Sequence, residues 1–121
     1  MHSTLKLKRR AYLKGKRGEW IAALYLRLKG YRILEKRYKT PVGEIDLIAC
    51  KGKTMIAVEV KTRDTLEKAF LALTPFQQKR IERTLLFYLT GKTLDLDLRF
   101  DLVLISSWRW PRHIQGAWIV Q

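Results

Sequence analysis

Two apolar segments, residues 43–50 and 55–61, constrain the fold of this chain more than any other feature of its sequence. Each is long enough for a strand and rich in isoleucine, valine and other apolar residues. The sequence Lys51-Gly52-Lys53 between them is typical of a hairpin turn. An antiparallel hairpin is therefore predicted at the centre of the chain, with charged side chains at alternate positions along both of its strands.

The charged side chains of the hairpin are Glu44 and Asp46 on its first strand and Glu59 and Lys61 on its second. Residues two apart on a strand point the same way, so each pair shares a face. Symmetric pairing about the turn places Asp46 opposite Val58, and a slip of one residue places it opposite Glu59. Neighbouring strands lie ~4.8 Å apart, so after that slip both carboxylates reach one cation, with Lys61 ~6.6 Å farther along the same face.

A cluster of carboxylates inside apolar segments needs a cation, a shared proton or a basic partner. Hard oxygen ligands with open positions suit Mg²⁺ or Mn²⁺, which lower the pKa of a bound water and stabilise charge on a phosphoryl group. Lys61 is placed to orient that water or to neutralise charge in the transition state. Glu44 and Glu19 are candidate further ligands. The alternative is a solvated sheet face with salt bridges, which the apolar neighbours of Glu59 disfavour.

Hydrophobic periodicity predicts two helical regions. The first is residues 19–29, whose apolar residues at helical spacing are Ile21, Leu24, Tyr25 and Leu28, with Trp20 beside them. The second is residues 66–90, where Leu73-Thr74-Pro75 predicts a short turn followed by a main helix from Pro75. The apolar stripe of this main helix is Ile81, Leu85, Tyr88 and Leu89.

Further strands are predicted at residues 31–38, 99–106 and 114–120. The order of elements is then α-β-β-β-α-β-β, which indicates an α/β fold with a mixed central sheet flanked by helices. Residues 1–14 form a basic N-terminal arm, and residues 15–121 form one folded domain.

The chain has 121 residues and a formal net charge of +14, from 25 lysines and arginines against 11 acids. A surplus this large favours a polyanionic partner such as DNA, RNA or an anionic membrane. The longest apolar run, Trp20 to Leu26, is too short to span a bilayer, so no membrane segment is expected. The single cysteine, Cys50, excludes an internal disulfide, argues against a cysteine zinc site and fits a reducing, cytoplasmic setting.

Basic and amide side chains near the hairpin are candidates for binding nucleic acid. They are Lys14, Lys16 and Arg17 of the basic N-terminal region, Arg37 and Lys39, Arg63, and Gln78 and Lys79 at the start of the main helix. The alternatives are a solubilising tail and a solvated helix face. Trp108, Trp110 and Trp118 either stack on bases or fill a core edge or interface, and the second interpretation is preferred.

Two motifs of the hairpin resemble those of a known family. They are Gly43-Glu44-Ile45-Asp46-Leu47-Ile48-Ala49 and Val58-Glu59-Val60-Lys61-Thr62-Arg63. Similar motifs occur in the YraN-like bacterial proteins, an uncharacterised family related to the PD-(D/E)xK nuclease superfamily. The resemblance covers about residues 15–120. It implies a restriction-endonuclease-like fold and metal-dependent endonuclease activity on DNA, with Mg²⁺ or Mn²⁺ as the cofactor.

The resemblance also implies residue roles. Asp46 and Glu59 would be metal ligands, joined by the backbone carbonyl of Val60, and Lys61 would be the catalytic lysine. Glu19 is similar to a first-helix glutamate of archaeal Holliday-junction resolvases, which implies branched DNA as the substrate and a homodimer as the active form.

Three features of the chain are not explained by this resemblance. Glu44 belongs to the YraN-like signature without an assigned role, while Arg37 and Gln77 depart from a frequent asparagine and a frequent lysine. Two alternatives to a nuclease remain open: a nucleic-acid-binding module of the same fold that does not cut, and an RNA- or ribosome-associated factor.

Overall fold

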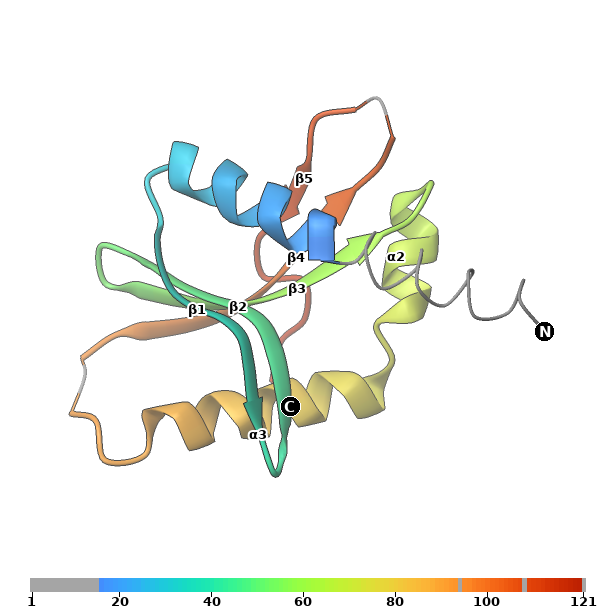
Figure 1. The fold of residues 1–121 in the computed structure, drawn as a ribbon. Helices are drawn as coiled ribbons and strands as arrows, with labels where there is room; N and C mark the ends of the chain where they lie inside the picture. Colours follow the sequence, from blue (N-terminus) through green and yellow to red (C-terminus); the bar gives the residue numbers. More distant parts are fainter. Residues whose placement is uncertain (1–15, 94, 108, 121) are drawn as a thin grey trace, which may run out of the picture.

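The structure, a computed structural model, describes residues 16–93, 95–107 and 109–120. The basic arm predicted at residues 1–14, with Lys14, and Trp108 lie outside the described residues. Within them, three helices and a five-stranded sheet form a mixed α/β arrangement (Figure 1). No helix in this part of the chain is long and apolar enough to cross a membrane.

The strands follow one another across the sheet in chain order. They are β1 (Arg32–Thr40), β2 (Gly43–Lys51), β3 (Thr54–Thr62), β4 (Asp97–Ile105) and β5 (Arg112–Ile114). Neighbouring strands are antiparallel except β3 and β4, which are parallel and are connected through α2 (Leu66–Ala72) and α3 (Pro75–Leu89). The predicted mixed sheet is confirmed, and α2 replaces the short turn expected before the main helix.

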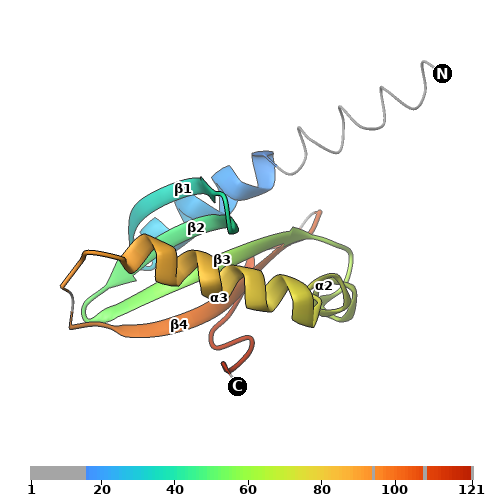
Figure 2. The same ribbon diagram turned by 90° about the horizontal axis from the view of Figure 1, so that it is seen from below.

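The first helix, described over residues 16–28, covers one face of the sheet (Figures 1 and 2). Its contact surface consists of small side chains: Ala22 is buried, and a Cβ atom on Gly18 would lie only 2.8 Å from the Thr62 hydroxyl oxygen. Leu26 is the large side chain of this helix that is fully buried. Glycine and alanine thus allow the helix to approach the sheet closely.

The predicted helix is confirmed, but its apolar residues at helical spacing do not all face the sheet. Leu24 is 43% exposed, Leu28 is 74% exposed, and Trp20 beside them is 61% exposed. Ile21 and Tyr25 are partly buried. A close helix–sheet contact leaves no room for several large side chains, so the small residues occupy the interface and the large ones point outward.

The opposite face of the sheet is covered by α3 (Figure 2). Thr74 caps this helix by accepting a hydrogen bond from the Gln77 N–H at 3.2 Å, and Pro75 occupies its first turn. The predicted stripe is confirmed, because Ile81 and Leu85 are buried and the remaining two members pack beside them. Their contacts on the sheet are Ile45, Ile48, Met55, Ala57 and Phe100.

The hairpin of β1 and β2 bends toward α3 (Figure 1). An irregularity of register between Ile33 and Glu35 interrupts the ladder on β1, where a bulge increases local twist. At the tip of the hairpin, a Cβ atom on Gly43 would lie 2.6 Å from Oγ1 of the buried Thr84. Glycine is therefore required at position 43 for β2 to pack against α3.

The last strand was predicted at residues 114–120, and this boundary was wrong, because β5 ends at residue 114. Gly116 turns the chain with a φ of +62°, and its N–H donates a hydrogen bond to the Asp101 carboxylate at 3.0 Å. Trp118 then stacks on Phe100, with ring centroids 5.1 Å apart. This tryptophan lies at the edge of the core.

Candidate metal centre

Strands β2 and β3 separate at a fork, which holds two of the predicted metal ligands. The last residues that pair are Leu47 and Val58. The same register sets Asp46 opposite Glu59, the arrangement expected after a slip of one residue. Beyond the last pair, the Val60 N–H donates a hydrogen bond to Asp46 Oδ2 at 2.8 Å. The Asp46 carboxylate therefore occupies the gap where the two backbones no longer pair.

Lys61 lies beside Glu59 on β3. Its Nζ is 3.3 Å from Glu59 Oε1, and the two side chains are 12% and 15% exposed. An ion pair was also expected if these residues lined a solvated sheet face, but side chains so little exposed do not fit a solvated face. Glu59 and Lys61 are a mostly buried pair, whose desolvation opposes folding unless other groups compensate it.

Burial raises the pKa of Glu59 to about 8, and the neighbouring Asp46 carboxylate contributes to the rise. The Lys61 ammonium lowers this pKa but does not outweigh both effects. Burial also raises the pKa of Asp46, although the hydrogen bond from the Val60 N–H partly offsets it. Without a cation, burial therefore favours the protonated form of both carboxyl groups.

The fork opens into a cavity of about 280 Å³ between the β1–β2 hairpin and α3. Its lining residues are Lys39, Thr40, Gly43, Glu44, Asp46, Glu59, Gln77, Arg80 and Ile81. Oε1 of Gln77 is buried with no hydrogen-bond partner among the described residues. A buried polar atom without a partner costs about 1–3 kcal/mol, which a water, a cation or a ligand hydroxyl in the cavity would remove.

Glu19 of the first helix approaches the same region. Its Oε2 is 2.8 Å from Arg37 Nε, and its side chain is 16% exposed. A small cavity of about 60 Å³ is lined by both residues together with Glu44 and Asp46. Burial raises the pKa of Glu19, Asp46 adds to the rise, and Arg37 opposes it. Three of the predicted acids therefore surround one cavity, and an arginine is already bound to one of them.

Arg37 also has an unusual backbone conformation. Its φ is +50°, a left-handed value that is uncommon outside glycine. A residue held in such a conformation destabilises the fold by about 1–3 kcal/mol, and such residues cluster at functional sites. The surrounding β1–β2 hairpin holds Arg37 against Glu19 in spite of this strain.

The oxygen atoms at the fork fit a hard divalent cation. Asp46 and Glu59 supply two carboxylates, and Val60 adds a carbonyl, because the N–H and C=O groups of a strand residue point to the same side. The described residues contain no group of three or more His, Cys, Asp or Glu side chains arranged to hold a metal ion. Two carboxylates supplemented by water and phosphate oxygens are a ligand pattern that Mg²⁺ uses.

Some residues predicted to bind nucleic acid lie near the fork and others do not. Lys39 lines the cavity at the fork, while Lys16 and Arg17 are exposed in the first described turn of the first helix. Arg63 is exposed at the end of β3, where its guanidinium donates a hydrogen bond to the Thr62 carbonyl at 2.9 Å. Of these four cations, Lys39 is the one that lines the cavity at the fork.

Gln78 and Lys79 line a different cavity. Gln78 Nε2 donates a hydrogen bond to the Leu73 carbonyl at 3.1 Å, and Lys79 Nζ is 3.7 Å from Glu82 Oε1. The residues of α3 that line the cavity at the fork are Gln77, Arg80 and Ile81. Gln77 lies four residues before Ile81 of the predicted apolar stripe, so helical spacing would have identified it, and Arg80 lies three residues after Gln77.

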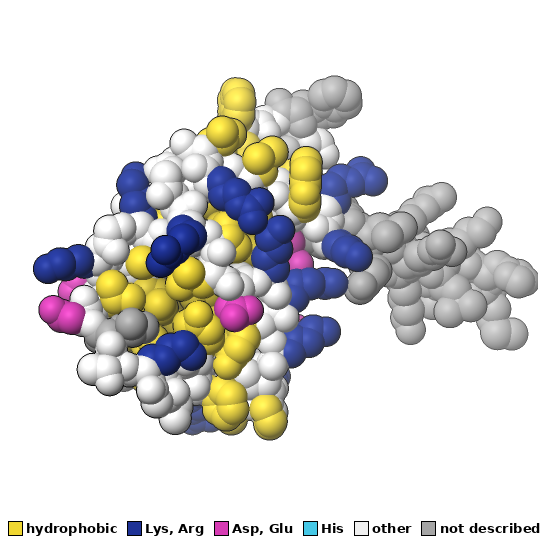
Figure 3. Space-filling view, turned by 60° about the vertical axis from the view of Figure 1, so that its left-hand side comes forward, with side chains coloured by type: hydrophobic (Ala, Val, Ile, Leu, Met, Phe, Trp, Pro, Cys, Tyr) yellow, Lys and Arg dark blue, Asp and Glu magenta, His cyan; other side chains and the backbone are white. Residues whose placement is uncertain are grey.

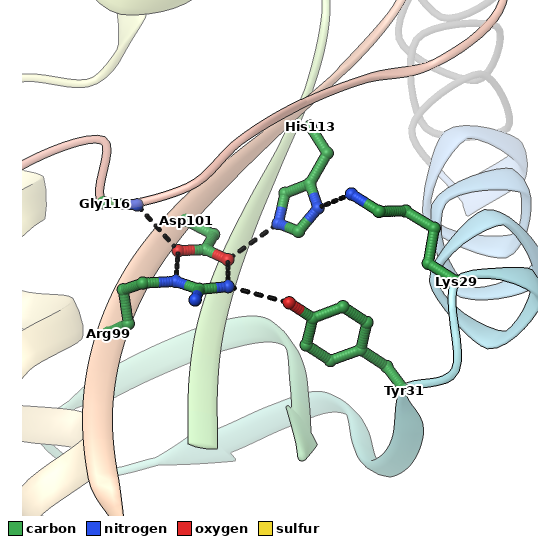
Figure 4. Close-up of polar contacts among 6 residues, drawn as sticks. All are labelled: Lys29, Tyr31, Arg99, Asp101, His113 and Gly116. Carbon is green, nitrogen blue, oxygen red and sulfur yellow. Dashed lines mark hydrogen bonds and ion pairs between the residues drawn. The ribbon is translucent and has the colours of Figure 1, made fainter. Parts of the chain in front are cut away.

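A second buried carboxylate, Asp101 of β4, is surrounded by hydrogen-bond donors (Figure 4). Arg99 donates from Nε and from one terminal nitrogen, each at 2.8 Å, and the Gly116 N–H donates at 3.0 Å. His113 Nε2 lies 2.7 Å from Asp101 Oδ2. Arg99 also donates to the Tyr31 hydroxyl at 2.8 Å. A bidentate arginine of this kind is a strong partner for a carboxylate.

His113 joins this cluster to the end of the first helix (Figure 4). Its Nδ1 lies 2.6 Å from Lys29 Nζ. An ammonium group only donates, so Nδ1 accepts and the Nε2–H donates to Asp101. Burial alone would raise the pKa of Asp101, but the hydrogen bonds from Arg99, His113 and Gly116 bring it below its ordinary value. The cluster ties the segment after β4 to the sheet.

Comparison with known proteins agrees with the motifs. Residues 18–105 match a family described as uncharacterised protein family UPF0102. A UPF0102 protein of Parvibaculum lavamentivorans is 51% identical over 111 residues, which are 89% of this chain and 83% of that protein. A UPF0102 protein of Chelativorans sp. is 49% identical over 113 residues, 92% of this chain and 91% of that protein. The resemblance to YraN-like proteins is confirmed, and the chain belongs to the uncharacterised protein family UPF0102.

Proposed function

We propose that this protein is a metal-dependent phosphodiesterase that hydrolyses DNA, with Asp46 and Glu59 as metal ligands and Lys61 as the catalytic lysine. The observation that carries the proposal is the buried Asp46–Glu59 pair at the fork, beside Lys61. Two buried carboxyl groups with raised pKa values oppose folding when ionised, and a bound divalent cation would compensate their charge. Membership of an uncharacterised family assigns no activity by itself.

Each group at the fork suits one part of the reaction. When bound, Mg²⁺ or Mn²⁺ lowers the pKa of a water and stabilises charge on the phosphoryl group. Asp46, Glu59 and the Val60 carbonyl would hold the cation. Lys61 Nζ, positioned 3.3 Å from Glu59 Oε1, orients the attacking water and neutralises charge on the phosphoryl oxygens in the transition state. Gln77 Oε1, buried without a partner among the described residues, would accept a hydrogen bond from a water in the cavity at the fork.

Glu19 and Glu44 support the centre from the rim of the smaller cavity. Arg37 now holds Glu19 at 2.8 Å, and a guanidinium also binds phosphate well. Transfer of Arg37 from Glu19 to a DNA phosphate would release a third carboxylate toward the cation. Substrate binding would thereby complete a ligand set that is incomplete in the free protein.

The distribution of charge favours DNA as the substrate. Lysine and arginine side chains outnumber acidic ones on the face shown in Figure 3, in keeping with the net charge of +14. Lys39 and Arg80 line the cavity at the fork itself. A polyanion would therefore be drawn toward the two carboxylates by the bases around them. A restriction-endonuclease-like fold, acting as a homodimer on branched DNA, is part of the same proposal.

The test is cleavage of labelled duplex, single-stranded, flapped and four-way DNA by the pure protein in Mn²⁺. We expect cleavage of at least one substrate and a rate lowered by about 100-fold or more in Lys61→Ala. The matched control is Lys53→Ala, which removes an exposed lysine from the turn of the same hairpin and should leave the rate unchanged. Cleavage no faster than that of Lys61→Ala on all four substrates would contradict the proposal.

A second candidate is a nucleic-acid-binding protein of the same fold that does not cut. It is favoured by one observation: within the described residues, no three side chains are arranged to hold a metal ion. DNA binding that persists without any Mg²⁺ or Mn²⁺ uptake would support this candidate over the nuclease. Competition between matched DNA and RNA at one stated salt concentration would then separate a DNA-binding role from an RNA- or ribosome-associated one.

A further inference from the structure

A second cavity, of about 480 Å³, lies beside the fork and has no part in the proposed metal chemistry. It is formed where the start of the first helix meets the ends of β3 and β4 and the loop that leads to β5 (Figure 1). The lining residues that bear on its chemistry are Arg17, Arg109, Trp110 and the hydroxyl-bearing Thr62, Ser106 and Ser107. Cavities that bind small molecules have volumes of about 300–1,000 Å³, so this one is large enough for a ligand.

The chemistry of this cavity matches a nucleotide. Trp110 is 80% exposed, so it does not fill the core, although burial of its indole would be favourable. Arg17 and Arg109 contribute guanidinium groups, and no acidic residue is among the lining residues. The hydroxyl groups of Thr62 and Ser107 supply both hydrogen-bond donors and acceptors. An aromatic face stacks on a nucleotide base, cations bind the phosphates, and hydroxyl groups form hydrogen bonds with the polar edge of the base.

The cavity adjoins the fork along two elements. On β3, Lys61 pairs with Glu59 at the fork, whereas the next residue, Thr62, lines the cavity. On the first helix, Gly18 lines the cavity and Glu19 lines the smaller cavity beside Asp46. Side chains at adjacent strand positions point to opposite faces of the sheet, so a DNA strand that occupies both sites would pass around the end of β3.

We propose that this cavity binds one unpaired nucleotide of a DNA strand next to the bond cleaved at the fork, an inference that rests on the proposed function. A paired base is held inside the duplex stack, whereas an unpaired base can turn outward into a pocket. Trp110 stacks on the base, and Arg17 and Arg109 contact the phosphates on either side. The substrate class is therefore DNA with an unpaired strand beside the cut, such as a flap, rather than intact duplex.

The experiment measures binding in the absence of metal, in an Asp46→Asn background in which no bond is cleaved. The probe is flapped DNA with 2-aminopurine at its first unpaired position, whose fluorescence falls when the base stacks. We expect Trp110→Ala to abolish this fall and to weaken flap binding by about 10-fold, while Trp110→Phe keeps most of both. The matched control is Trp20→Ala, which removes a tryptophan that is 61% exposed outside the cavity and should change neither.

Equal affinities of the protein for flapped and for intact duplex DNA would overturn the inference. A Trp110→Ala variant that loses affinity equally for the two kinds of DNA would also overturn it. Tighter, Trp110-dependent binding of a matched RNA flap would overturn the assignment to DNA. All affinities are compared at one salt concentration. Since no metal is present, an absence of nuclease activity leaves these results standing. Metal-dependent cleavage combined with binding that does not depend on Trp110 would remove this inference alone.

Discussion

Two buried acidic clusters on the same sheet are built in opposite ways. Asp101 of β4 is 0% exposed and receives hydrogen bonds from Arg99, His113 and Gly116, which bring its pKa below the ordinary value. At the fork, Asp46 and Glu59 face each other, and burial raises the pKa of both. The first cluster favours the charged carboxylate, whereas the second favours the protonated one.

This difference separates a carboxylate that stabilises the fold from a pair that does not. Replacing a buried ionic group by apolar side chains of similar volume often leaves the stability of a protein unchanged or raises it. The fork acids are therefore not explained by folding, and the unpaired Gln77 Oε1 beside them is not either. Both are explained if the cavity binds a cation together with its water and a phosphate.

The largest effect is expected from Asp101→Ala. Removing this carboxylate leaves Arg99 and His113 without their buried partner, and breaking a buried ion pair costs about 3–5 kcal/mol. The free energy of unfolding, measured in urea, should fall by about that amount. The control is Asp97→Ala, which removes an exposed acid from the start of the same strand and should have little effect. Equal stabilities of the two variants would show that the Asp101 cluster is not a stabilising one.

The next effect concerns pH. The pKa of Glu59 rises from 4.5 in the unfolded chain to about 8 in the fold, so its contribution to stability is present below about pH 4.5 and is lost as pH rises toward 8. Glutamine resembles the protonated acid, so Glu59→Gln should remove this loss and make the variant the more stable protein above pH 8, by a few kcal/mol. Urea unfolding of both proteins between pH 5 and about 9 measures the difference.

Asp101 should show the opposite dependence. Its pKa is lower in the fold than in the unfolded chain, so its contribution to stability is present above the unfolded value and is lost as pH falls through the folded one. The variants Glu59→Gln and Asp101→Ala should therefore change the slope of stability against pH in separate ranges. If the slope of stability against pH were the same in Glu59→Gln and in the unmodified protein, Glu59 would be ionised over the whole pH range measured. That result would break the comparison.

The smallest effects come from single neutral groups in the two regions. Tyr31→Phe removes a hydroxyl that accepts a hydrogen bond from Arg99 at 2.8 Å, and should cost about 1 kcal/mol. Gln77→Met removes an acceptor that is buried without a partner among the described residues, and should be neutral or stabilising. Thermal unfolding compares the two variants. A Gln77→Met protein destabilised as much as Tyr31→Phe would show that the fork is as well satisfied as the Asp101 cluster.

The hairpin and its motif could be predicted from the sequence because both depend on local patterns. Alternation placed the fork acids on adjacent strands, and the turn limited their register to two choices, one of which the structure adopts. The stripe of α3 followed from helical spacing in the same way. The first helix differed, since its small residues rather than its large ones pack against the sheet, and periodicity of large apolar residues does not detect such a contact.

The parts that could not be predicted depend on contacts between distant residues. The close approach of β2 to α3 depends on Gly43 lying against Thr84. The ion pair of Glu19 with Arg37 joins the first helix to β1, and the pairing of β5 with β4 brings His113 to Asp101. No short-range pattern in the sequence specifies these contacts.

The central claim is that the acids at the fork are there to bind a divalent cation. Calorimetric titration with Mn²⁺ tests it most directly, with Asp64→Asn, which alters an acid that is 88% exposed, as the control. We predict saturable binding by the unmodified protein and by the control, its loss in both Asp46→Asn and Glu59→Gln, and release of protons on binding because Glu59 has a pKa of about 8. No uptake of Mn²⁺ by the unmodified protein, or the same uptake in Asp46→Asn, would contradict the claim.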